Sequence, residues 1–373
     1  VSLGWFLTLG IRIVYPALLP KISAEFGLDA AASGLLLSAL WATYAVLQFP
    51  GGVVADIAGE RVVLSASLAG TAVAVAAIVV APTLTLFVIA TIGLGVTTGF
   101  YGTTRLTILA ATFDRMQTTA ISVSQAAGNV GNVLLAAGAG VVSVAFGWRW
   151  GFGYVLPGMI VLAIGLPFVI PARSADSADG SSITSTMRTV LATVRRPRVL
   201  AVFGLLTGAM FLYQSVTGFL PTYLVVAKGL EPGTAAGLFS VFLATAIGVQ
   251  FLAGILADRR GNAVAIGILL GAALPAFVLL ATVETLPGII VAVVLASTVL
   301  GAMPPVNAAG VGALPEAVRG SGFGLLRTGY IVIGATGPPI VGLFADAGRF
   351  DLAFIGLGGL AGLTAVWGML VVR

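Results

Sequence analysis

The chain contains no cysteine and no histidine, and only 8% of its 373 residues are charged. The absence of cysteine excludes disulfide bonds and thiolate nucleophiles, and the absence of both residue types removes the usual zinc and haem ligands. Without histidine the chain also lacks the side chain that titrates near neutrality unaided. We therefore expect no metal, no cofactor and no enzyme chemistry in this chain.

The low charge is matched by a high apolar content. Hydrophobic residues make up 59% of the chain and the mean hydropathy is +1.12. Soluble domains carry about 25% charged residues, so a soluble fold is excluded. The net charge of +5 does not indicate a nucleic-acid partner, because the basic residues are scattered and form no stripe with interleaved aromatics. The composition predicts an all-α, multi-pass membrane protein in contact with the lipid bilayer.

Charge, proline and glycine divide the chain into apolar stretches that are each long enough to cross a bilayer, which takes about 20 residues in a helix. We predict twelve transmembrane spans. They lie at 1–22, 32–55, 62–81, 84–112, 117–146, 152–170, 199–226, 234–257, 262–282, 286–313, 321–345 and 352–372. The pairs Pro304-Pro305 and Pro338-Pro339 are expected to kink the tenth and eleventh spans.

Lysine and arginine are unevenly shared between the two sets of connecting loops. Eleven lie on one side and four on the other, and the basic side is expected to face the cytoplasm. Since twelve is even, both termini are predicted to be cytoplasmic, in a protein of the plasma membrane. The polar stretch 172–197 is predicted to be a cytoplasmic linker between an N-terminal six-helix bundle, 1–171, and a C-terminal one, 198–373.

The two halves are related by an internal repeat. A shift of 202 residues, without gaps, places one half on the other. Gln48-Phe49 then matches Gln250-Phe251, residues 52–56 (GVVAD) match 254–258 (GILAD), and Gly27-Leu28 matches Gly229-Leu230. Two pseudo-symmetric six-helix bundles are a transporter architecture, in which the substrate lies near the membrane midplane.

The loop after the second predicted span, residues 51–61, reads GGVVADIAGER. This sequence resembles the signature G-G-x-x-x-D-x-x-G-x-R of the major facilitator superfamily, and residues 254–261 resemble a second copy. The resemblance covers the whole chain and implies a transporter that works by alternating access as a functional monomer. The second copy has Ala263 where the first has Arg61, and the fifth span lacks the Gly-Pro motif of many antiporters. These differences weaken the prediction that the transporter exports its substrate.

The resemblance also implies a cytoplasmic gate, in which Asp56 and Arg61 hold the two halves closed. An aspartate near the start of a neighbouring helix can accept hydrogen bonds from its free amides, and glycines allow tight helix approach and a turn. The predicted gate residues are Gly52, Asp56, Gly59, Arg61, Asp258, Arg259 and Gly261. The alternative is a solvated loop that only ends two helices.

Three arginines, Arg12, Arg105 and Arg327, lie inside predicted spans, where each costs about 2.5–3.5 kcal/mol. In the 202-residue register each matches an amide residue, which predicts a pseudo-symmetric polar ring. Tyrosines three or four residues from the buried arginines, and an asparagine four residues after Gln125, lie on the same helix faces and extend this ring. The predicted substrate-binding residues are Arg12, Arg105, Arg327, Tyr15, Tyr101, Tyr330, Gln125, Asn129, Gln214 and Asn307.

All thirteen acidic residues are predicted in loops or at helix ends, so a counter-ion for these arginines is expected from outside the protein. This favours a small organic anion, a carboxylate or a phosphate ester, as the substrate. Exchange, facilitated movement and symport all remain open. The alternative is an exporter of drugs or other apolar compounds, in which the arginines are structural or reach the interface and the amides join helices. A membrane-embedded enzyme lacks a catalytic cluster, and a sensor or scaffold lacks an output domain.

Overall fold

The computed structural model describes residues 1–113, 117–170, 193, 195–315 and 319–372. This described part is helical and contains no strand. Eleven of its helices are long and apolar enough to cross a membrane. The shorter apolar helix α2 (Ala30–Val46) continues past Leu47 into α3 (Gln48–Ala58) and completes the second predicted span. The prediction of twelve spans is therefore confirmed.

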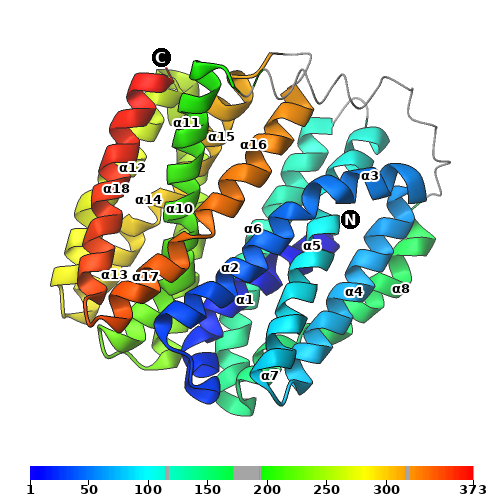
Figure 1. Cartoon of the computed structure of the whole chain (residues 1–373), viewed down its shortest axis with the longest axis horizontal. Helices are drawn as coiled ribbons and strands as arrows, with labels where there is room; N and C mark the ends of the chain where they lie inside the picture. Colours follow the sequence, from blue (N-terminus) through cyan, green and yellow to red (C-terminus); the bar gives the residue numbers. More distant parts are fainter. Residues whose placement is uncertain (114–116, 171–192, 194, 316–318, 373) are drawn as a thin grey trace. The chain divides into compact units, whose positions relative to one another are not determined.

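The helices follow the predicted spans closely (Figure 1). Up to residue 170 they are α1 (Ser2–Phe26), α2, α3, α4 (Glu60–Val80), α5 (Leu84–Thr112), α6 (Gln117–Phe146), α7 (Trp148–Gly153) and α8 (Leu156–Val169). After residue 195 they are α10 (Pro197–Val226), α11 (Pro232–Arg260), α12 (Asn262–Thr282), α13 (Leu286–Ala296), α14 (Thr298–Gly301), α15 (Met303–Gly312), α16 (Arg319–Gly334), α17 (Gly337–Asp346) and α18 (Phe350–Val371). The predicted limits of α5, α6 and α12 agree with the structure at both ends.

The tenth and eleventh spans are broken as the paired prolines predict. The tenth is divided into α13, α14 and α15, and the eleventh into α16 and α17. Pro304 and Pro305 lie in the first turn of α15, and Pro338 and Pro339 in that of α17. Proline is tolerated in a first turn, where no amide donor is needed, but it removes a hydrogen bond from a helix interior. The helix therefore restarts at each pair.

The chain forms two compact units. Unit 1 comprises residues 1–28, 36–180 and 231–237, and unit 2 comprises residues 29–35, 181–230 and 238–373. Each unit thus includes a seven-residue segment from the other half of the sequence, and these two segments, 29–35 and 231–237, are 202 residues apart. Most of the predicted linker 172–197 lies outside the described residues, so the predicted bundle limits, 1–171 and 198–373, stay a prediction.

The repeat is visible in the backbone at matched glycines. The φ angle is 63° at Gly27 and 65° at Gly229, and it is 84° at Gly59 and 87° at Gly261. Such positive φ values favour glycine, because a Cβ atom meets the neighbouring backbone there. Both pairs are 202 residues apart, so the register found in the sequence is confirmed by local conformation.

Small residues bring the helices of unit 1 close together. A Cβ atom added to Gly131 of α6 would lie 2.2 Å from the carbonyl oxygen of Phe6 on α1. One added to Gly99 of α5 would lie 2.8 Å from the carbonyl oxygen of Tyr44 on α2. Close approach of this kind joins membrane helices.

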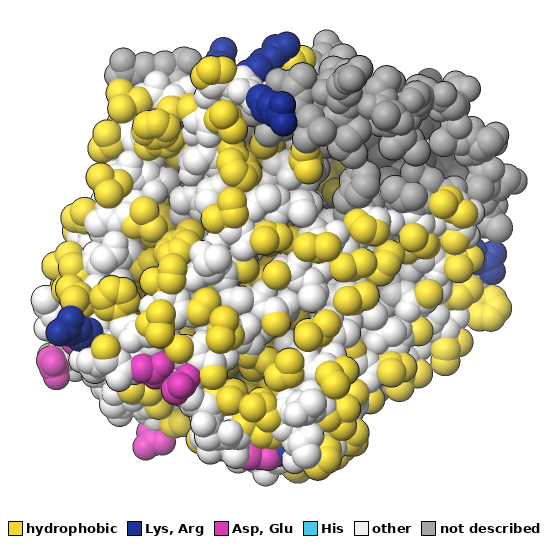
Figure 2. All heavy atoms as spheres, in the orientation of Figure 1, with side chains coloured by type: hydrophobic (Ala, Val, Ile, Leu, Met, Phe, Trp, Pro, Cys, Tyr) yellow, Lys and Arg dark blue, Asp and Glu magenta, His cyan; other side chains and the backbone are white. Residues whose placement is uncertain are grey.

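Apolar side chains also cover the outside of the protein. Phe168 is 84% exposed and Val169 is 81% exposed. Figure 2 shows hydrophobic side chains across the face in view, whereas the charged side chains lie toward its periphery. This distribution suits a surface that contacts hydrocarbon in its middle and water at its ends.

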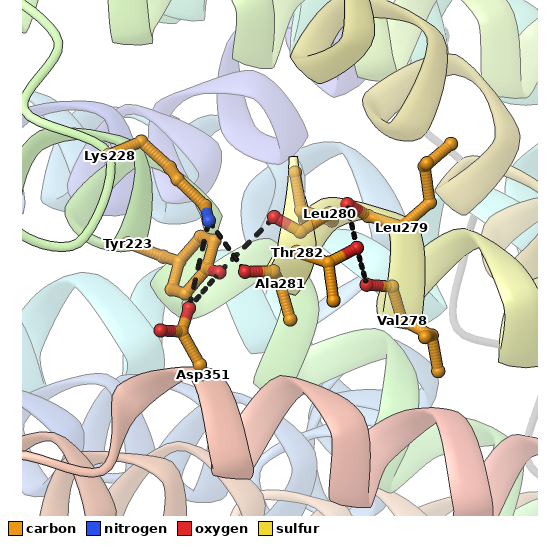
Figure 3. Close-up of polar contacts among 8 residues, drawn as sticks. All are labelled: Tyr223, Lys228, Val278, Leu279, Leu280, Ala281, Thr282 and Asp351. Atoms are coloured by element: carbon orange, nitrogen blue, oxygen red, sulfur yellow. Dashed lines mark hydrogen bonds and ion pairs between the residues drawn. The ribbon is translucent and has the colours of Figure 1, made fainter. Parts of the chain in front are cut away.

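Charged clusters at the helix ends differ between the units. In unit 1, Arg149 forms an ion pair with Glu25 of α1 and donates to the Ala81 carbonyl oxygen. In unit 2, Lys228, just after α10, donates to the Ala281 carbonyl oxygen at 2.8 Å, and its ammonium nitrogen lies 3.8 Å from a carboxylate oxygen of Asp351 (Figure 3). Arg149 and Asp351 are 202 residues apart, so the matched position carries opposite charges and each unit pairs it differently.

Candidate functional site

Arg12 on α1 is completely buried among aromatic rings of unit 1. Its guanidinium carbon lies 3.7 Å from the ring centroid of Tyr44, 5.2 Å from that of Trp41 and 5.6 Å from that of Trp5. Its Nε donates to the Thr8 carbonyl oxygen at 3.2 Å. A cation over an aromatic face gains about 2 kcal/mol when it is desolvated. The three rings therefore stabilise the buried cation.

Arg105 on α5 is 3% exposed and shares one of these rings. Its guanidinium carbon lies 4.1 Å from the Trp5 ring centroid. One terminal nitrogen donates to Ser124 Oγ at 2.9 Å, and the other donates to Gln125 Oε1 at 3.4 Å. Gln125 Nε2 in turn donates to Asn129 Oδ1 at 3.3 Å. The structure thus brings together Arg105, Gln125 and Asn129 of the predicted set.

The two predicted tyrosines of unit 1 have different surroundings. The Tyr101 hydroxyl donates to the Val1 carbonyl oxygen at 2.8 Å. Tyr15 instead packs its ring against Phe152, with centroids 4.7 Å apart, and its hydroxyl shares a 2.7 Å hydrogen bond with Thr91. These contacts place Tyr15 in the aromatic core of unit 1, although it lies only three residues after Arg12 on the same helix.

The matched residues of unit 2 make smaller, neutral contacts. Gln214 is fully buried, and its Nε2 donates to the Ile331 carbonyl oxygen at 3.0 Å. Its Oε1 has no hydrogen-bond partner in the described part of the chain. The Tyr330 hydroxyl donates to Asn307 Oδ1 at 3.3 Å. Arg327, one turn before Tyr330, is half-buried, and so it is more accessible than Arg12 or Arg105.

Sequence reasoning did not include Trp5, Trp41, Tyr44 and Ser124 in the site. A signal for Trp5 was available, since it precedes Arg12 by seven residues and therefore lies on the same face of α1. Trp41 and Tyr44 are three residues apart on the second span, which places their rings on one face of α2. Only the packing of α1 against other helices shows that these rings surround a cation.

Comparison with known proteins identifies the family. The model of the Major Facilitator Superfamily matches residues 1–330. The chain belongs to the major facilitator superfamily. It is accordingly a multi-pass membrane transporter that works by alternating access, and not an enzyme. No curated protein sequence matches the chain.

Solved structures of this superfamily have the same fold. A bacterial homologue of the human lysosomal transporter Spinster, in an inward-facing and unoccupied conformation, is 16% identical with a TM-score of 0.83, over 100% of this chain and 95% of that one. A mutant of the nucleoside transporter NupG is 15% identical with a TM-score of 0.81, over 100% and 98%. A D-xylose-proton symporter is 15% identical with a TM-score of 0.78, over 98% and 95%. The proteins named differ in substrate, so the fold alone does not fix what this chain carries.

The signature loops of the superfamily contain the predicted gate residues. Gly59 and Gly261 adopt positive φ angles, at the turns between α3 and α4 and between α11 and α12. A Cβ atom added to Gly52 would meet nothing within 4 Å, whereas the two turns require glycine for their positive φ angles. Asp258 and Arg259 lie near the end of α11, and Arg61 lies in the first turn of α4. The Asp56 side chain lies outside the described part.

Within the described residues, no group of histidine, cysteine or acidic side chains has an arrangement that could hold a metal ion. The predicted site is instead a set of arginine, amide, hydroxyl and aromatic groups. Such groups bind by hydrogen bonding, charge and stacking.

Proposed function

We propose that this transporter moves a small organic anion, a carboxylate or a phosphate ester, across the plasma membrane. The observation that carries the proposal is the setting of Arg105, a buried guanidinium group whose terminal nitrogens donate to Ser124 and Gln125 and which lies over the Trp5 ring. A carboxylate or phosphate accepts paired, charge-assisted hydrogen bonds from guanidinium. An anionic substrate would pair with this guanidinium group through such bonds.

The distribution of acidic side chains supports an anion. The eight acids whose side chains the structure describes all lie near helix ends or between helices: Glu25, Asp29, Glu60, Glu231, Asp258, Glu284, Asp346 and Asp351. Arg105, by contrast, is seven residues before the end of α5 and 21 residues after its start. Among the described side chains, a substrate carboxylate at this depth meets the Arg105 cation, while the described acids lie nearer the helix ends.

We assign the substrate contact in unit 2 to Arg327. Its partial exposure leaves a cation accessible to a ligand, and the hydrogen-bonded pair Tyr330 and Asn307 belongs to the same unit. Arginine recognises oxyanions through its planar pair of donors. Gln214, with its buried Oε1, is proposed to accept a hydrogen bond from a hydroxyl group of the substrate.

Arg12 and Tyr15 receive structural roles in this proposal. Arg12 is enclosed by Trp5, Trp41 and Tyr44, and therefore it fixes the Trp5 ring against which Arg105 packs. Tyr15 belongs to the aromatic core. The remaining predicted members, Tyr101, Gln125 and Asn129, are proposed to shape the polar surroundings of Arg105.

We further propose that Asp56 and Arg61 latch the cytoplasmic gate, that both termini are cytoplasmic, and that the monomer is the functional form. The basis is the superfamily signature in residues 51–61 together with the excess of lysine and arginine in one set of loops. Accessibility labelling of single cysteines, introduced into this naturally cysteine-free chain, tests the orientation directly. Labelling of an Arg260→Cys variant from outside intact cells would contradict it.

A ligand screen tests the substrate class. Detergent-purified protein is heated with small carboxylates, phosphate esters, sugars, amines or lipophilic cations, because a ligand that binds the folded state raises its melting temperature. We expect one class of anion to stabilise the wild type and to lose this effect in Arg327→Gln. Arg349→Gln, which removes an exposed arginine just before α18, is the matched control and should keep the full response.

A second candidate function is export of drugs or other apolar compounds, and the aromatic enclosure of Arg12 favours it. If aromatic rings also stabilise Arg105 and Arg327 in this way, all three arginines have structural roles and none binds substrate. Stabilisation by lipophilic cations that is equal in the wild type and in Arg327→Gln would replace the anion proposal with this one.

A further inference from the structure

One face of unit 2 contains an apolar groove of about 500 Å³ between α10 and α18. Its lining includes Gly204, Gly208, Leu363, Thr364, Trp367 and Leu370. Leu363 is 71% exposed, Leu370 is 59% exposed and Trp367 is 46% exposed, so the groove opens on the outer surface. In a membrane protein such an outer surface faces hydrocarbon, and the volume lies within the range of about 300–1,000 Å³ that is usual for ligand pockets.

The groove is held open by its own residues. Trp367 Nε1 donates to the Ala201 carbonyl oxygen at 2.9 Å, which fixes the indole ring as one wall. A Cβ atom at Gly204 would meet only Trp367 Nε1, at an ordinary contact distance of 3.6 Å. The absence of a side chain at Gly204 therefore leaves room at the base of the groove, which a larger residue would fill without a clash with the backbone.

Positive charge gathers at the end of this groove. Arg195, Arg196 and Arg198 are all exposed and surround the start of α10. Arg198 precedes Gly204 by six residues, a rise of about 9 Å along the helix. In Figure 1 the start of α10 and the end of α18 lie at the same end of unit 2. Clusters of arginine next to a span attract anionic lipid headgroups, each arginine near the surface contributing measurably.

A second groove provides an internal contrast. In unit 1, a groove of about 480 Å³ is lined by small and apolar residues that include Gly140, Val144, Gly233 and Gly237. The charged residue nearest to Gly233 in the sequence is the exposed acid Glu231. The two grooves are similar in volume and in apolar lining but differ in nearby charge, because three arginines precede Gly204 at the start of α10, whereas one lysine, Lys21, contacts Ser143 beside the unit 1 groove. Charge complementarity therefore selects the unit 2 groove for an anionic lipid.

We propose that the unit 2 groove binds one molecule of anionic phospholipid. Its phosphate group contacts Arg195, Arg196 and Arg198, while an acyl chain lies over Gly204 and against Trp367. The site is separate from the arginines assigned to the substrate and does not depend on the transported compound. It makes a bilayer lipid a bound partner of the start of α10, the helix that follows the segment between the two halves of the sequence.

The test compares phosphatidylglycerol with phosphatidylcholine of identical acyl chains, added to detergent-purified full-length protein and counted as bound molecules by native mass spectrometry. We expect one tightly bound phosphatidylglycerol and no tightly bound phosphatidylcholine. Replacement of all three arginines by glutamine should weaken phosphatidylglycerol binding roughly 100-fold, given the typical effect of a surface arginine. Gly204→Leu should abolish the tight site by filling the groove.

Two controls keep the proposal falsifiable. Gly165→Leu adds the same side chain in open space on α8, and Arg349→Gln removes an arginine at the opposite end of α18, so both should bind the lipid as the wild type does. Equal binding of phosphatidylcholine, unchanged binding in Gly204→Leu, or full competition by glycerol phosphate without acyl chains would each overturn the proposal. The last result would show a headgroup contact that makes no use of the groove.

Discussion

Arg12 in unit 1 and Gln214 in unit 2 occupy matched positions of the repeat but have different surroundings. Arg12 is enclosed by Trp5, Trp41 and Tyr44. The residues 202 positions later are Thr207, Leu243 and Ala246, so all three aromatic rings are replaced together with the cation. A buried cation costs several kcal/mol in a membrane unless its surroundings compensate. The comparison indicates that the buried arginine and its three rings depend on one another, and the matched positions of the other half of the repeat have neither.

The strongest way to break this comparison is to remove the ring that both buried arginines contact. Trp5 is 2% exposed and lies against Arg12 and Arg105. Trp5→Ala should lower the free energy of unfolding by about 3–5 kcal/mol, because it leaves a cavity and removes two cation–π contacts. Thr207→Ala, at the matched position, should cost about 1 kcal/mol or less. Equal losses in denaturant unfolding of the two variants would contradict the comparison.

Transferring the cation without its rings tests the same idea from the other side. Gln214→Arg places a guanidinium group where no matched aromatic ring exists, and it should destabilise the protein by about 2.5–3.5 kcal/mol. Gln214→Met, which has a similar length and no charge, loses the hydrogen bond to Ile331 and should cost about 1 kcal/mol. Melting temperatures in one detergent give the difference, and an arginine variant as stable as the methionine variant would show that the rings are unnecessary.

The contribution of a single ring face can be isolated at Tyr44, the ring nearest to the Arg12 guanidinium group. Tyr44→Leu should cost about 2 kcal/mol, since it keeps an apolar side chain but removes the aromatic face. Tyr44→Phe keeps that face and should lose less than half as much. If the leucine and phenylalanine variants unfold at the same denaturant concentration, the contact between cation and ring is not stabilising.

The sequence was sufficient to predict the twelve spans, the 202-residue repeat and the superfamily, because hydropathy, glycine conformation and the signature loop are local properties. The neighbourhood of Gln125 and Asn129 followed from their spacing, but the register pairs Gln125 with Arg327 and did not predict its hydrogen bond with Arg105. The enclosure of Arg12 could not be predicted in this way, because two of its rings lie on another helix. In the sequence, only carboxylates were considered as partners of the arginines, and aromatic rings were not. Tyr15 was placed by its spacing from Arg12, but packing against Phe152 decides the direction of its ring.

Arg327, the most accessible of the three arginines, allows a role in substrate binding to be compared with the role of Arg12 in folding. Arg327 is half-buried, whereas Arg12 is fully buried, so replacement of Arg327 should affect binding more than folding. For the anion identified by the ligand screen, Arg327→Gln should weaken binding about tenfold, equivalent to about 1.4 kcal/mol, with a melting temperature of the free protein within about 2 °C of wild type. Arg12→Gln should instead lower the melting temperature and leave the affinity for the anion nearly unchanged, because its cation stabilises the fold through Tyr44, Trp41 and Trp5. Titrations of both variants by thermal shift separate the two roles, and a large loss of stability in Arg327→Gln without a change in affinity would assign Arg327 to the structure of unit 2 instead of the substrate.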